Sequence, residues 1–195
     1  MRRTLAVTLA AVSLALFASP AMAVSATHIA IDDFFFSPQT KTVPVASSLP
    51  LEWDNGGSFA HTATSDVNGF FDTGQIPAGN TGVDSLAGAG TYKYHCTNHS
   101  TMHGTLKVRP TVSAASIGVG DPVTITFGIA LQKGFTFDLE RRRNGGDWIT
   151  MRSQTDFSSA TFTPSRTGTY DFRARTHNPL GKVSGYSPMR TVTVS

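Results

Sequence analysis

The stretch that decides the fold is Gly90 to Val108, which reads GTYKYHCTNHSTMHGTLKV. On either side of its centre, apolar residues alternate with polar ones, which is the pattern of a β-strand with one buried face. Tyr92, Tyr94 and Cys96 share one face of the first run, and Leu106 lies on the buried face of the second. We therefore expect two neighbouring strands of a β-sandwich, joined by a short loop at one end.

That loop carries three side chains that bind metals, because Cys96, His99 and Met102 lie within seven residues. These donors are soft or borderline, and two imidazoles with one thiolate and a weak axial thioether form an electron-transfer copper site. The second imidazole has to come from elsewhere in the chain. His61 can supply it, since it begins a predicted strand that ends at Ser65 and follows a turn-rich run. We therefore predict a site for one copper ion.

The same residues resemble a known family, the cupredoxins or blue copper proteins. The spacing Cys-x-x-His-x-x-Met is similar to that of the amicyanin type, and the likeness covers nearly all of Val24–Arg109. It implies a Greek-key β-sandwich in which His61, Cys96 and His99 are the equatorial copper ligands and Met102 is the axial one. The exposed edge of the second histidine would pass electrons in and out. The other matching motifs are FSP at 36–38, LEWDN at 51–55, FDTG at 71–74 and GTY at 90–92.

Parts of the ligand loop depart from the amicyanin pattern. Asn98, Ser100 and Thr101 stand where that family places proline and an apolar aromatic residue around the exposed histidine. We therefore expect a more polar docking face, and the same partner, a methylamine dehydrogenase, is not implied. Thr62 stands where the family often has an Asn or Ser that ties the two ligand loops together, so we expect the threonine to make this link.

Alternatives to a copper electron carrier remain open at this stage. A single cysteine in a β-strand is most often a plain core residue. Zinc competes for Cys and His ligands, although structural zinc prefers four of them and thioether binds it poorly. An extracytoplasmic copper carrier would use the same donors as an electron carrier. An enzyme is not indicated, because the chain has no His-x-His pair and four side-chain ligands leave no open position on the metal.

Four other histidines are expected to lie at or near the surface rather than to bind the metal, and these are His28, His95, His103 and His177. The strands expected in the first half are 28–32, 41–45, 49–54, 61–65, 81–86, 90–96 and 104–109. Those expected in the second half are 122–127, 135–142, 147–152, 160–163, 169–176 and 190–194. Both halves therefore predict an all-β fold.

The first 23 residues have the order of features of a secretory signal peptide. Arg2 and Arg3 form a basic start, an apolar run follows over 5–18, and Ala21 to Ala23 offer small residues for cleavage. The run is shorter than the roughly 20 residues that a transmembrane helix needs. We therefore expect no transmembrane segment and an exported mature chain that begins at Val24, either periplasmic or secreted. Its single cysteine cannot form an internal disulfide.

Residues 110–195 predict a second β-sandwich domain after the copper domain of 24–109. The run 167–187, with Tyr170 near its start, resembles the last two strands of a fibronectin type III domain, and this implies an immunoglobulin-like fold. Its function is open. An exposed aromatic groove with Trp148 or Tyr186 would indicate adhesion or polysaccharide binding, and Arg141–Arg143 would allow docking to anionic polymers of the cell envelope.

Charge gives little information on partners. The formal net charge is +3 at pH 7, and nothing in its distribution predicts nucleic acid binding. Val24–Arg109 contains four Lys or Arg against seven Asp or Glu, whereas residues 110–195 contain ten against six. Two differently charged solvated surfaces are the simpler explanation, and steering toward a charged partner is the alternative. The partners we expect are an electron donor and an electron acceptor, both redox proteins.

Overall fold

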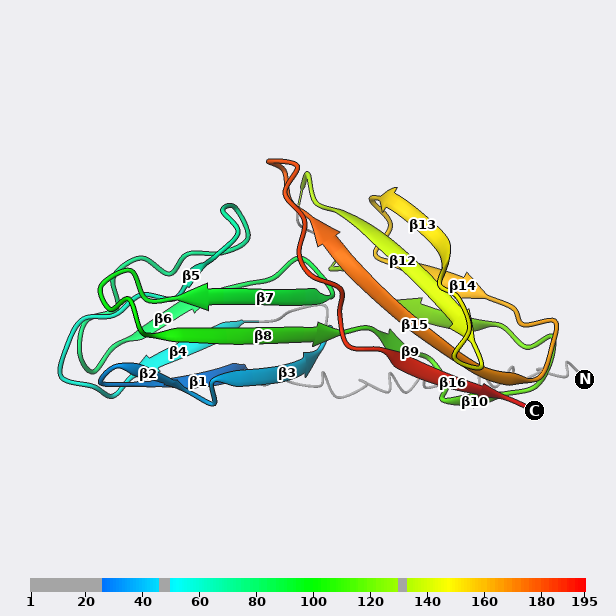
Figure 1. Cartoon of the computed structure of the whole chain (residues 1–195), viewed down its shortest axis with the longest axis horizontal. Helices are drawn as coiled ribbons and strands as arrows, with labels where there is room; N and C mark the ends of the chain where they lie inside the picture. Colours follow the sequence, from blue (N-terminus) through cyan, green and yellow to red (C-terminus); the bar gives the residue numbers. More distant parts are fainter. Residues whose placement is uncertain (1–25, 46–49, 130–132) are drawn as a thin grey trace, which may run out of the picture.

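The computed structural model describes residues 26–45, 50–129 and 133–195, so the predicted signal peptide lies outside the described ranges. Within these ranges the chain is all-β, with sixteen strands in four sheets. The same ranges contain no helix long and apolar enough to cross a membrane. The strands form two β-sandwiches that follow one another along the chain and lie side by side (Figure 1).

The first sandwich contains two four-stranded sheets, with the orders β2-β1-β4-β6 and β3-β8-β7-β5. β1 runs parallel to β4 and β3 runs parallel to β8, whereas the other neighbours are antiparallel. The bounds are β1 (Thr27–Asp32), β2 (Phe35–Ser37), β3 (Thr40–Pro44), β4 (Leu51–Asn55), β5 (Thr64–Ser65), β6 (Thr81–Asp84), β7 (Gly90–His95) and β8 (His103–Arg109).

Side chains from both sheets fill one core, and the alternation predicted for β7 is confirmed. Tyr92 and Tyr94 are buried while Lys93 between them is exposed. Trp53 of β4 is fully buried and stacks on Phe71, with 5.4 Å between the ring centroids. Because interlocked aromatic side chains resist displacement, this core gives the loop after β7 a firm base.

The second sandwich has a five-stranded sheet, β10-β16-β15-β12-β13, and a three-stranded sheet, β14-β11-β9. β10 pairs with β16 in parallel and the other pairs are antiparallel. The bounds are β9 (Thr111–Val112), β10 (Ser116–Ile117), β11 (Val123–Thr126), β12 (Thr136–Arg143), β13 (Ile149–Thr155), β14 (Ser159–Phe162), β15 (Gly168–His177) and β16 (Arg190–Val194).

Most of the predicted strands are present, but the one predicted over 61–65 is wrong. Only Thr64–Ser65 forms β5, and His61 makes an isolated bridge with Ile76. The backbone of His61 bonds to Ile76 in both directions, at 3.1 and 2.7 Å, so the chain is anchored to the segment before β6 instead of continuing β5. β2, β9 and β10 were not predicted, because two or three residues are too few to show a period.

The two sandwiches are joined by backbone hydrogen bonds at the start of β7. Thr91 and Gly185 exchange two of them, at 2.8 and 3.0 Å, and the Ala89 amide donates to the Phe127 carbonyl at 2.8 Å. Ala87 and Ala89 are buried in the apolar core of the second sandwich. The short segment before β7 therefore belongs to both packing units.

Candidate metal centre

The predicted ligand loop lies at the end of the first sandwich that faces away from the second. β7 ends at His95 and β8 begins at His103, and the turn between these two strands lies at that end in Figure 1. Two backbone hydrogen bonds close the loop, from Cys96 to the Met102 carbonyl and from Met102 to the His99 carbonyl, both at 3.0 Å. The loop is therefore a compact turn that continues the paired strands.

Three of the four predicted ligands bring their donor atoms together. The Cys96 sulfur lies 3.7 Å from Nδ1 of His61 and 3.6 Å from Nδ1 of His99, and the two nitrogens are 3.1 Å apart. The centre of this triangle lies about 2.0 Å from all three atoms. For comparison, a zinc ion in proteins binds nitrogen and sulfur at roughly 2.0 and 2.3 Å. The donor set therefore fits one transition-metal ion of this size.

Met102, the fourth predicted ligand, ends the same loop. Its side chain is 1 % exposed and belongs to the core of the first sandwich. Cys96 is buried to the same degree, and His61 is fully buried, whereas His99 is only partly buried. One imidazole of the cluster therefore reaches toward solvent, and the other three side chains are shielded from it.

The surroundings of His61 favour its neutral form. Burial, followed by the nearby His99, lowers the pKa of the His61 imidazole. Neutral imidazole is the form that binds a metal ion. Nδ1 is the atom that faces Cys96, while Nε2 is buried and lacks a hydrogen bond partner within the described part of the chain. Protonation of both ring nitrogens is therefore disfavoured in the closed site.

Thr62 connects the two ligand segments, as the sequence predicted. Its backbone amide donates to the Cys96 sulfur at 3.4 Å, and its hydroxyl accepts a hydrogen bond from the Thr97 amide at 2.9 Å. The threonine thus binds both the metal-facing atom and the backbone beside it.

The surface around His99 is less polar than the loop residues alone predicted. Phe34 and Phe59 are 52 and 51 % exposed, and each forms a T-shaped contact with the His99 ring, with centroids 5.1 and 6.3 Å away. They come from the turns after β1 and β4, so their proximity to the loop could not be read from its sequence. Phe34 also has a positive φ of 74°, which aromatic residues rarely adopt.

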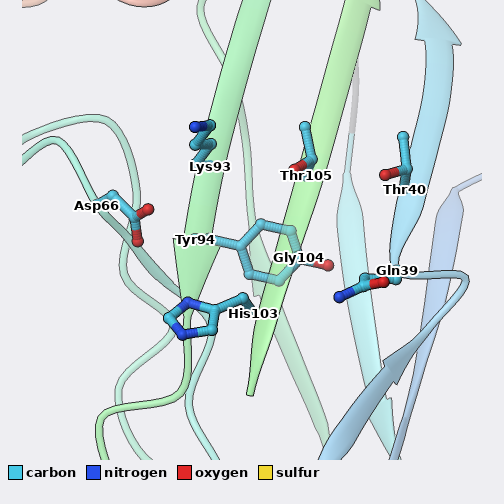
Figure 2. A pocket seen from close by; sticks show the side chains of 8 residues that line it. All are labelled: Gln39, Thr40, Asp66, Lys93, Tyr94, His103, Gly104 and Thr105. Carbon is cyan, nitrogen blue, oxygen red and sulfur yellow. The ribbon is translucent and has the colours of Figure 1, made fainter. Parts of the chain in front are cut away.

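Glycine at the start of β8 is required by the packing behind the loop. The ring of Tyr94 lies against Gly104, where a Cβ atom would collide with the phenol. Both residues line a pocket of about 360 Å³, together with Asp66 and His103. Figure 2 shows these four residues. Burial raises the pKa of Tyr94 to about 12, so the phenol stays neutral.

The two histidines that flank the ligands, His95 and His103, lie outside the donor cluster as predicted. His103 is exposed, and His95 binds Asp66 at 2.7 Å.

Comparisons with known families and curated proteins find no match. Among solved structures the chain is similar to a purple cupredoxin from Nitrosopumilus maritimus, at 27 % identity over 42 % of this chain and 98 % of that one, with a TM-score of 0.38. It is similar to a copper-containing nitrite reductase from Thermus scotoductus SA-01, at 24 % identity over 47 % of this chain and 24 % of that one, with a TM-score of 0.40. It is also similar to an oxidized amicyanin mutant, at 22 % identity over 44 % of this chain and 86 % of that one, with a TM-score of 0.39.

Proposed function

We propose that this chain is a type 1 copper protein that carries single electrons between redox proteins, with His61, Cys96, His99 and Met102 as the ligands. The observation that carries the proposal is the triangle of one sulfur and two imidazole nitrogens, with sides of 3.1 to 3.7 Å. Two imidazoles and a thiolate with a nearby thioether are the donors of electron-transfer copper sites. Four side-chain ligands leave no position for a substrate, so we propose a carrier and not an enzyme.

Copper bound there would supply the redox change between Cu(II) and Cu(I). The protein's part is to hold the donors still, so that the change in charge requires little movement. The loop is closed by its own backbone, and Thr62 ties Cys96 to the segment that carries His61. The partly exposed ring of His99, which contacts Phe34 and Phe59, is the proposed point at which electrons reach a partner.

The first experiment is a visible and paramagnetic resonance spectrum of the mature protein after addition of Cu(II), followed by ascorbate. An intense band near roughly 600 nm that ascorbate bleaches reversibly is expected from a copper-thiolate site. Cys96→Ser should abolish the band, and His103→Ala should keep it, because that exposed histidine lies outside the donor cluster. Full colour in the cysteine variant would refute the assignment.

A copper carrier without a redox function is the second candidate, and the partial exposure of His99 is the observation that allows it. A carrier has to release copper readily, whereas an electron carrier should retain it through many redox cycles. Transfer of copper to a chelator distinguishes them. Release within seconds from the reduced protein would favour the carrier, and retention over hours would favour electron transfer.

For the second half we propose an immunoglobulin-like domain of the fibronectin type III kind over 110–195, after a cupredoxin domain over 24–109. The Tyr170 hydroxyl donates to the Arg166 carbonyl at 3.0 Å, which supports this because such a tyrosine corner is a feature of these sandwiches. Arg173 stacks on both Trp148 and Tyr186, each at 4.0 Å, so these faces are covered and do not offer an aromatic groove for sugars. This favours docking to a protein or envelope polymer over sugar stacking.

We also propose that the protein is exported and acts outside the cytoplasm. The support is the basic start, apolar run and small residues of 1–23 in the sequence. N-terminal sequencing of the protein from the periplasm or the medium should find Val24 first. A cytoplasmic protein that still begins at Met1 would refute export without affecting the copper assignment.

A further inference from the structure

The side chain of Asn98 is held from outside the ligand loop. This residue lies between Cys96 and His99, and its Nδ2 group donates to the Ala60 carbonyl at 2.8 Å and to Oε1 of Gln75 at 2.9 Å. Nε2 of Gln75 donates back to Oδ1 of Asn98 at 3.0 Å. The two primary amides therefore form a reciprocal pair, and both amide protons of Asn98 are used.

Both partners of Asn98 are linked to the other imidazole ligand, Ala60 through the chain and Gln75 through the backbone pairing of its neighbour Ile76. Ala60 directly precedes His61, and Gln75 directly precedes Ile76, which exchanges two backbone hydrogen bonds with His61 at 3.1 and 2.7 Å. The amide pair consequently fastens the loop to the backbone that carries the first imidazole. None of these hydrogen bonds uses a ring nitrogen of His61 or His99.

A second link lies on the other side of His61. The Thr97 amide donates to the hydroxyl of Thr62, so consecutive loop residues, Thr97 and Asn98, bind the segments that follow and precede His61. Hydrogen bonds to the segments on both sides of His61 therefore restrict movement of the ligand loop in more than one direction.

We propose that the amide pair of Asn98 and Gln75 positions the metal site, by holding the His99 loop against the His61 segment before a metal binds. The inference rests on the proposed copper function. A loop that is already ordered in the metal-free protein loses less freedom on binding. Loss of the pair should therefore weaken copper binding and loosen the geometry around the ion, although neither residue is a ligand.

The test uses Asn98→Ala, Gln75→Ala and the double variant of the full mature protein. Gln75→Ala, which removes the reciprocal pair, should lower Cu(II) affinity by roughly two- to tenfold. Asn98→Ala should lower it at least as much, because it also removes the bond to the Ala60 carbonyl. The double variant should match Asn98→Ala, because both changes remove the same contact. The single variants Asn98→Gln and Gln75→Asn should each lower Cu(II) affinity. Combining the two changes, which exchanges the pair, should recover much of that loss. Gln39→Ala is the control, since this exposed glutamine lies outside the donor cluster.

A second readout does not depend on copper. In the metal-free protein, amide hydrogen exchange over 97–101 should be faster in the Asn98 and Gln75 variants than in the wild type or the Gln39 control. Unchanged exchange, or additive effects on affinity, would overturn the positioning role. A wild type without the thiolate band would refute the proposed function instead, and the exchange measurement would still decide whether the pair holds the loop.

Discussion

Replacement of Tyr92 by phenylalanine should weaken both halves of the protein together. Its phenol is buried at the junction, with the hydroxyl 2.7 Å from the Gly88 carbonyl and 3.0 Å from the hydroxyl of Thr176 in β15. That threonine in turn donates to the Ala89 carbonyl at 2.9 Å. Tyr92→Phe keeps the ring but leaves buried polar atoms without a partner, which costs about 1 to 3 kcal/mol of unfolding free energy.

Denaturant unfolding of the metal-free protein gives the magnitude, and hydrogen exchange by segment shows where protection is lost. We expect lower protection in β7 and in β15, because the removed hydroxyl lies between them. Tyr94→Phe is the matched control, since this phenol lies against Gly104 of β8, within the first sandwich, and its effect should stay there. A cost below about 0.5 kcal/mol, or a loss confined to β7, would refute the view that the halves unfold as one unit.

Three further predictions concern the site and the second sandwich. Met102→Leu should keep a coloured copper site and raise its reduction potential, measured by voltammetry, because the axial ligand tunes that potential. Gly104→Ala should cost about 1 to 3 kcal/mol in denaturant unfolding, since its methyl group meets the Tyr94 ring. Burial raises the pKa of Asp138, but bonds from His177, the Gln154 amide and Arg175 outweigh it and lower that pKa. The ionised Asp138 therefore contributes its full share of the unfolding free energy above the ordinary carboxyl pKa of 3.8, and this share is lost as the pH falls below that value. In Asp138→Asn the unfolding free energy should consequently fall less steeply as the pH is lowered.

The ligand loop could be predicted from sequence because its information is local. Cys96, His99 and Met102 occur at fixed intervals between two alternating strands, and alternation alone placed Cys96 on the buried face. A link from Thr62 to the ligand loop was expected from the family resemblance, and the bond from the Thr97 amide is one such link. By contrast, Gln75 lies far from the loop in sequence and has no distinguishing pattern around it, so its pairing with Asn98 depended on the folded backbone.

Residues of the second half show the same limit. His177 was expected to lie at or near the surface, yet its side chain is only 13 % exposed and binds Asp138 at 2.9 Å. Trp148 and Tyr186 were candidates for an open aromatic groove, and stacking by arginine closes them. Cross-strand neighbours bring these groups together, and strand register is not visible in a single strand's alternation.

The junction and the metal site lie at opposite ends of one strand, and this makes their effects separable. Tyr92 and Cys96 are four residues apart along an extended chain, which corresponds to about 13 Å. Changes more than about 10 Å apart without shared partners usually add. Tyr92→Phe should therefore lower stability while leaving the copper spectrum unchanged, and Asn98→Ala should alter copper binding with little effect on protection in β15. A spectrum that shifts in Tyr92→Phe would mean that the core beneath the loop transmits strain from the junction, and the two halves would then have to be treated as one functional unit.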